Sequence, residues 1–260
     1  MTTTTAPPRR NPFTDTLIVM GRELRPVASD PFSIVVGMIQ PLFFLLLFGP
    51  LVAATAAPNQ ESPWAWFVPG ILVMTSLFGT AATGSNLQYD MQGGSHERLL
   101  VTPLTRSALF IGRSLKAFVP IVIQAVVIVL VMIPFGFRPS IPGGAIGLLL
   151  VGILAVGIGS LSYALAIAVR KQDWMFWTIQ QTLLFPLMIL SGMLLPLDDG
   201  PPWIRVLSQF NPLTHVVNAE RDLFAGHLAT WNVGSGFLAA IATAILGFVL
   251  GLRALQSSTS

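Results

Sequence analysis

Six long stretches without a charged residue constrain this sequence more than any other feature. A helix needs about 20 apolar residues to cross the roughly 30 Å hydrocarbon core of a bilayer. The stretches span residues 32–60, 62–89, 117–137, 139–169, 174–197 and 223–252. Only 10% of the chain is charged, against about 25% in a soluble domain. We therefore expect an all-α membrane protein with six transmembrane helices near residues 32–54, 64–88, 115–136, 143–169, 174–196 and 232–253, in one domain over residues 31–255.

Lys and Arg gather on one side of this expected topology. If both termini face the cytoplasm, the inside set is Arg9, Arg10, Arg22, Arg25, Arg98, Arg106, Arg113, Lys116, Arg170, Lys171 and Arg253, and the outside set is Arg138, Arg205 and Arg221. Cytoplasmic loops carry an excess of Lys and Arg. The sequence therefore predicts a multi-pass protein of the cell (plasma) membrane with cytoplasmic N- and C-termini.

The residues before the first crossing divide into two parts. Residues 1–11 are rich in Thr and Pro, so we expect a disordered leader. Residues 12–30 mix apolar residues such as Phe13 and Leu17 with Asp15, Arg22 and Glu23. This mixture predicts an amphipathic helix lying at the membrane interface.

The loop between the second and third crossings predicts a short helix parallel to the membrane. Gly93 and Gly94 suit a helix end, Ser95 can cap a new helix, and Thr102 with Pro103 stops it. So short a helix needs a packing partner, which is either a cleft in another protein or the lipid headgroups. Arg106, Arg113 and Lys116 follow on one helix face and can anchor to headgroups or contact an acidic partner.

The segment over residues 196–229, on the outer side, is too long for a tight turn and too apolar for a solvated loop. Residues 203–210 and 214–224 can form two short amphipathic helices, broken at Asn211 and Pro212. Glu220, Arg221 and Asp222 are an acid-base cluster within it. We expect a structural role in which the charges neutralise one another and Arg221 reaches the headgroups, with substrate contact as the alternative.

Two G-x-x-x-G pairs lie in the predicted crossings. They are Gly143 with Gly147 and Gly247 with Gly251. Such pairs allow close approach of helices, and we interpret these as packing sites within the chain and not as a dimer contact.

Several classes of function are disfavoured by what the sequence lacks. It has no G-x-x-x-x-G-K-[ST] segment to hold nucleotide phosphates, so the energy source must lie in another chain. The predicted crossings contain no Asp, Glu, Lys or Arg at depth, which disfavours an ion-coupled carrier. A membrane enzyme is disfavoured because His96, His215 and His227 fall at scattered positions. We expect no metal site, and the few basic residues suggest anionic lipid and not nucleic acid.

Three segments carry a resemblance to a known family. The loop GSHERLLVTPLTR, from Gly94 to Arg106, resembles that of ABC type 2 transporter permeases, nearest to the daunorubicin-resistance-like drug exporters. QPLFFLLLF in the first crossing and SGMLLPLDDGPPWIRVLSQFNPLTHVVNAERDLF after the fifth extend the likeness.

This resemblance implies the membrane subunit of an ATP-driven exporter, and not an enzyme. It would dimerise with a second permease copy or a paralogue and dock a separate ABC ATPase that binds ATP and Mg, while this chain binds no cofactor. The cargo would be a hydrophobic drug, secondary metabolite or lipid. Polysaccharide or lipid-linked glycan export is the alternative, and an ion-coupled secondary transporter is less favoured.

The resemblance also assigns two sets of site residues. The short cytoplasmic helix would couple to the ATPase through Glu97, Arg98, Leu99, Leu100, Thr102, Pro103, Leu104 and Arg106. The two short external helices would be re-entrant, folding partly back into the outer leaflet, with Pro196, Trp203, Asn211, Pro212, Glu220 and Arg221 as their marked positions.

Overall fold

The computed structural model describes residues 12–29, 31–55, 63–81, 83–92, 106–170, 172–197 and 200–257. Every regular element in these ranges is an α-helix, which confirms the all-α prediction. In chain order the helices are α1 (Pro12–Ser29), α2 (Pro31–Thr55), α3 (Pro63–Ala81), α4 (Thr83–Gln92), α6 (Arg106–Leu115), α7 (Phe118–Met132), α8 (Ile141–Ala168), α9 (Asp173–Leu190), α10 (Pro202–Gln209), α11 (Pro212–Phe224) and α12 (Trp231–Ser257). The predicted leader over residues 1–11 lies outside the described residues.

Five helical stretches of the described chain are long and apolar enough to cross a membrane. They are Ile34–Leu51, Pro63–Tyr89, Phe110–Met132, Ile141–Ala168 and Trp231–Leu255. The stretch expected as a fifth crossing over 174–196 is a shorter apolar helix, Trp174–Leu190. It ends early because the chain turns at Ser191 and Gly192, where Gly192 has a φ of +70°.

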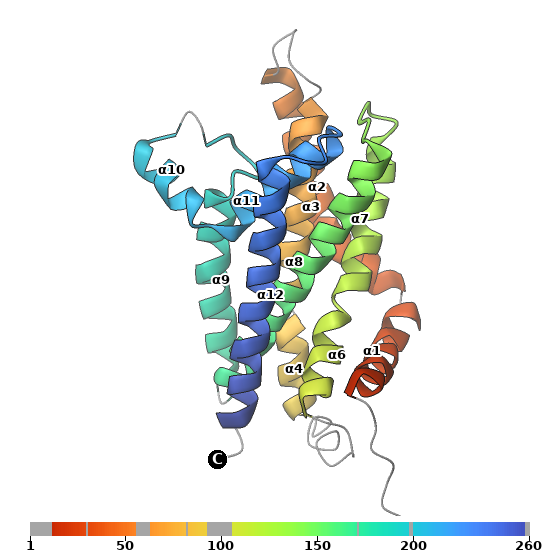
Figure 1. Cartoon of the computed structure of the whole chain (residues 1–260), viewed down its shortest axis with the longest axis vertical. Coiled ribbons are helices and arrows are strands. Elements are labelled where there is room, and N and C mark those ends of the chain that lie inside the picture. The colour runs from red at the N-terminus through yellow and green to blue at the C-terminus, as the bar shows by residue number, and fades with distance from the viewer. Residues whose placement is uncertain are drawn as a thin grey trace, which may run out of the picture.

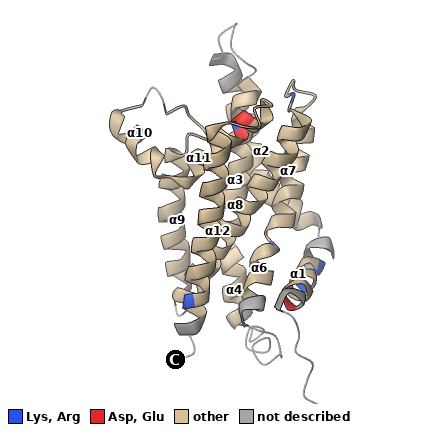
Figure 2. Ribbon diagram, in the orientation of Figure 1, with Lys and Arg blue, Asp and Glu red and all other residues tan. Residues whose placement is uncertain are grey.

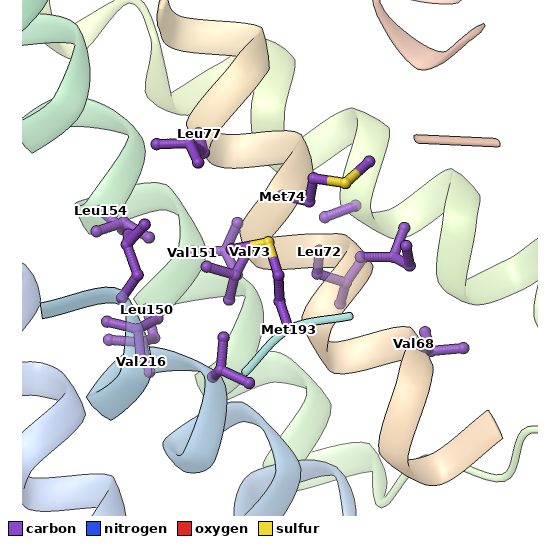
Figure 3. Packing of buried hydrophobic residues seen from close by; sticks show 14 of the residues in the cluster. Val68, Leu72, Val73, Met74, Leu77, Leu150, Val151, Leu154, Met193 and Val216 are labelled. Carbon is purple, nitrogen blue, oxygen red and sulfur yellow. The ribbon is translucent and has the colours of Figure 1, made fainter. Parts of the chain in front are cut away.

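Helix α8 forms the centre of the bundle and packs against α3, α4, α7, α11 and α12 (Figure 1). Its N-terminal half packs against α3 and α11, so that Leu150 and Val151 of α8 lie beside Val73 of α3 and Val216 of α11 (Figure 3). These side chains are fully buried. Dispersion contacts and close packing hold this core, because a bilayer supplies little hydrophobic driving force between helices.

The outward faces of the bundle are apolar, and the charges lie toward its two ends. Large exposed side chains include Phe43, Leu46 and Leu47 on α2 and Leu238 and Ile245 on α12. Among the residues described, the clearly coloured segments in Figure 2 lie at α1, near the C-terminal end of α12 and near α11. An apolar belt between two charged ends fits a helix bundle that faces lipid.

Both G-x-x-x-G pairs are packing sites within the chain, as predicted. A Cβ at Gly143 or Gly147 would collide with the Leu223 carbonyl or the Glu220 carboxyl of α11. Gly247 packs against Ser160 and Gly157 of α8, and Gly251 packs against the Phe110 ring of α6. The missing side chains therefore let α11, α12 and α6 lie directly on their neighbours.

Candidate functional site

The predicted coupling helix falls between two described helices at one end of the bundle. Its residues Glu97, Arg98, Leu99, Leu100, Thr102, Pro103 and Leu104 lie outside the described residues. Arg106 is the first residue of α6. Helix α4 leads into the loop and α6 leads out of it, and α1 packs beside α6 (Figure 1). We name this end, formed by α1, α4 and α6, the α6 end.

An acidic side chain of α1 joins α1 to α6. The Glu23 carboxyl pairs with Arg113, whose Nε lies 3.2 Å from Oε1, and with Lys116, whose Nζ lies 2.8 Å from Oε2. Burial opposes the ionised form of Glu23, but the charges and hydrogen bonds of Lys116 and Arg113 outweigh it and lower the pKa of this carboxyl. The acidic group that meets these cations therefore belongs to the chain's own α1. Sequence reasoning missed this pair.

The helix predicted over 64–88 corresponds to α3 and α4, and Ser162 of α8 is hydrogen-bonded to both. Its Oγ donates to the Ala81 carbonyl at 2.5 Å and accepts from the Gly84 amide at 3.0 Å. Gly84 packs against Ser162 and the Phe176 ring, so a side chain there would collide with both. The helix that leads into the predicted coupling segment is thus fixed to α8 through the Ser162 side chain.

At the opposite end, α11 begins at a hydrogen-bonded cap. The Asn211 Oδ1 accepts from the Leu213 amide at 3.0 Å, and Pro212 occupies the first helical turn. The Asn211 Nδ2 donates to the Leu187 carbonyl at 2.7 Å, and Thr214 Oγ1 donates to the Leu190 carbonyl at 2.9 Å. The cap therefore also satisfies carbonyl groups in the last turn of α9. We name this end, formed by α10 and α11, the α11 end.

Arg221 ties α11 to two other segments of the α11 end. Its Nε donates to the Trp66 carbonyl at 3.2 Å and its Nη2 donates to the Gly192 carbonyl at 2.8 Å. The guanidinium also lies over the Trp66 ring, 4.3 Å from its centroid. Such an arrangement uses the planar fork and the charge of Arg together. Two other residues predicted for the external site, Pro196 and Trp203, are exposed.

The three charged residues of the acid-base cluster each meet a different set of neighbours, and their mutual neutralisation stays a prediction. Asp222 accepts hydrogen bonds from Thr230 at 2.6 Å and Asn232 at 3.1 Å. Glu220 is fully buried, and neither of its carboxyl oxygens has a hydrogen-bond partner among the residues that the structure describes. Burial raises the pKa of Glu220 to about 8. Three adjacent residues thus point to different neighbours because consecutive helical positions project about 100° apart.

A profile of the ABC-2 type transporter family matches residues 14–225, from the first turn of α1 to the residue after α11. The chain belongs to the ABC-2 type transporter family. This finding confirms the resemblance carried by the loop and external segments. Within the described residues of this ABC-2 transporter chain, no group of three or more His, Cys, Asp or Glu could hold a metal ion.

Several relatives of this ABC-2 transporter chain are named as permeases. It is 25% identical to the daunorubicin resistance ABC transporter permease protein DrrB1 of Streptomyces coeruleorubidus over 232 residues, which cover 88% of this chain and 81% of the relative. It is 29% identical to the putative transport permease ycf38 of Cyanophora paradoxa over 246 residues, 87% of this chain and 84% of the relative. It is also 25% identical to the probable multidrug ABC transporter permease YbhR of Escherichia coli K12 over 171 residues, 64% of this chain and 45% of that relative. ABC transporter permeases are membrane subunits and are not themselves enzymes, so this chain is a multi-pass membrane transport subunit.

Proposed function

We propose that this permease moves a hydrophobic drug, secondary metabolite or lipid out of the cell, driven by ATP hydrolysis in a separate ATPase subunit. One observation carries the proposal: the likeness to a daunorubicin resistance permease extends over 88% of this chain. The apolar outer faces of the described helices support an apolar cargo. ATP and Mg²⁺ would bind in the ATPase.

The α6 end is the proposed docking end. Helices α4 and α6 carry the two ends of the loop, and α4 is held to α8 through Ser162. A force applied to residues 97–104 would therefore pass along α4 into the centre of the bundle and along α6 into α1. This arrangement supports coupling through Glu97, Arg98, Leu99, Leu100, Thr102, Pro103, Leu104 and Arg106.

The proposed topology has six crossings, with the α6 end and both termini in the cytoplasm. Helix α9 would be the sixth crossing; its 17 apolar residues from Trp174 span about 26 Å at 1.5 Å per residue. That length is slightly less than a hydrocarbon core of roughly 30 Å, which local thinning can accommodate. The α11 end would then lie in the outer leaflet, with α10 and α11 re-entrant, and two such permeases would form a dimer.

The test is co-expression of the chain with a candidate P-loop ATPase in lipid. We expect the wild-type pair to co-purify, to hydrolyse ATP and to lower the accumulation of daunorubicin in cells. Leu100→Asp should abolish co-purification, because a carboxylate replaces an apolar docking contact, and Glu97→Ala should lower ATPase stimulation. Leu228→Asp makes the same change in the exposed loop after α11, at the opposite end, and should leave assembly intact. If no ATPase co-purifies and the loop variants behave as wild type, the docking role is wrong.

A further inference from the structure

Glu220 occupies a closed site between three helices. Helix α11 packs against α3, α8 and α12, and the Glu220 side chain has no exposed surface. A Cβ at Gly147 of α8 would lie 2.5 Å from the Glu220 Oε2 and 3.3 Å from the Phe224 ring. The carboxyl group therefore fills the space that the glycine leaves. On α12, Gly236 packs directly against Ala219, the residue before Glu220.

The helices around Glu220 bring no charge near it. Helix α3 has no ionisable residue, and the ionisable residues of the other packed helices are Tyr163 on α8, Asp173 on α9, Arg205 on α10 and Arg253 on α12. Tyr163 and Arg253 lie 16 and 17 positions along their helices from Gly147 and Gly236, or about 25 Å at 1.5 Å per residue. Asp173 begins α9, whose far end contacts α11, and Arg205 is exposed on α10.

The ionisable neighbours on α11 itself are engaged elsewhere. His215 bonds to the Gln209 carbonyl through Nε2 at 2.9 Å. Arg221 donates to the carbonyls of Trp66 and Gly192, and Asp222 accepts from Thr230 and Asn232. Within the described part of the chain, an ionised carboxylate at Glu220 would consequently be a buried charge that meets neither a cation nor a hydrogen-bond donor. Such a charge costs several kcal/mol, or about as much as many proteins have in stability.

We propose that Glu220 is a proton-binding site, in which a neutral carboxyl holds α11 against α8 and α12 and loss of the proton releases α11. A metal ion does not suit the site, because Ca²⁺ and Mg²⁺ take about six or more oxygen ligands and these carboxyl oxygens have no hydrogen-bond partner among the described residues. A bulky cationic cargo does not suit it either, since the glycine contact leaves the carboxyl no free surface. The proton is the one cation that needs no further space. This inference is independent of what the permease carries.

Proton release at Glu220 would act on the whole α11 end. Helix α11 also carries Arg221, which holds Trp66 of α3 and the turn after α9. The Glu220 carboxyl binds its proton more tightly in the folded protein than in the unfolded chain. The free energy of unfolding is therefore highest below a pH of about 4.5, and it decreases as the pH rises from about 4.5 to about 8. Above a pH of about 8, Glu220 is ionised in both the folded and the unfolded protein, and the stability decreases no further. Alkaline conditions on this side of the bundle would therefore loosen the contact between α3, α9 and α11.

The test compares the full-length protein with Glu220→Gln, a neutral mimic of the protonated acid, in lipid nanodiscs. We expect the wild-type Tm to fall relative to that of Glu220→Gln by about 4 °C or more between pH 5 and pH 8. Infrared difference spectra should contain the band of a protonated carboxyl in the wild type at neutral pH and lack it in the variant. Asp222→Asn, on the same helix, should keep both the pH dependence and the band.

Two outcomes would overturn the proposal. One is an identical pH profile for wild type and Glu220→Gln, with no difference in the carboxyl band. The other concerns the case in which Glu220→Gln does not fold. The test is then repeated with Glu220→Met, which replaces the acid by an apolar side chain of similar length. A folded Met variant without the pH dependence supports a neutral acid. If both variants fail at every pH, the native group is an ionised carboxylate with a partner, and the proton site is wrong.

Discussion

At the α11 end, helices meet backbone to backbone and through hydrogen bonds to carbonyl groups, whereas at the α6 end α1 meets α6 through an ion pair as well as through the close contact of Gly112 with Val19. Gly143 lies directly under the Leu223 carbonyl, and Arg221 donates to two carbonyls of other segments. At the α6 end, Glu23 contacts Arg113 and Lys116 through long, partly exposed side chains. Backbone contacts have no freedom to adjust, while paired long side chains can follow small movements.

This difference suits a transport subunit that receives force at one end. The α6 end carries the loop proposed to dock the ATPase, and its helices need to shift without separating. At the α11 end, in contrast, the close packing between glycines and carbonyl groups cannot adjust gradually. Loss of one such contact should therefore separate α11 from α8. Changes at the α11 end should therefore cost more than comparable changes at the α6 end.

The largest expected effect tests the backbone contact at Gly143. In Gly143→Ala the new Cβ collides with the Leu223 carbonyl, which is main chain and cannot rotate away. We expect a loss of about 3 kcal/mol of stability, measured as thermal unfolding in nanodiscs. Gly144→Ala changes the next residue of α8, where a Cβ makes only an ordinary 3.5 Å contact with Phe224, and it should be neutral or slightly stabilising. Equal behaviour of the two variants would show that α11 is not seated against α8.

A smaller effect is expected at Arg221. Arg221→Lys keeps the charge but cannot reach the Trp66 and Gly192 carbonyls together while covering the Trp66 ring. We expect a loss of about 2 kcal/mol and faster proteolysis of the turn after α9. Arg205→Lys makes the same change at an exposed position of α10 and should shift stability by less than about 0.5 kcal/mol. A tolerated Arg221→Lys would mean that charge alone holds the α11 end.

The sequence predicted the helices well where they are long and apolar. The first and last crossings, expected over 32–54 and 232–253, correspond to α2 (Pro31–Thr55) and α12 (Trp231–Ser257). The contact of Ser162 with the Ala81 carbonyl and the Gly84 amide was missed because Ser162 lies about 80 positions along the chain. A tertiary contact of that range leaves no local pattern.

The buried acid was also missed, although a signal for it existed. Glu220 shares a helix face with Leu213, Val216, Val217 and Phe224, at the spacing of an amphipathic helix. The search for buried charged residues covered only the long predicted crossings. It could not find Glu220, because α11 is too short to be a crossing and is buried by packing against other helices. Glu23 was missed for a similar reason: it follows Val19, buried against Gly112, by one turn on α1. The coupling residues 97–104 stay predictions.

The smallest expected effect is at the ion pair of the α6 end, where Glu23→Gln removes the charge and keeps the shape. We expect a loss of about 1 kcal/mol at neutral pH, because the pair is partly solvated, and this loss should shrink in high salt. The pKa of Glu23 is lowered in the fold, so its contribution is present above the unfolded value of about 4.5 and disappears as the pH falls below it. The stability difference between wild type and Glu23→Gln should thus vanish on acidification, opposite in direction to the pH dependence at Glu220. Arg22→Gln alters an exposed charge one position away and should show neither dependence. A Glu23→Gln effect that ignores both salt and pH would mean that apolar packing, and not charge, joins α1 to α6, and the contrast between the two ends would fail.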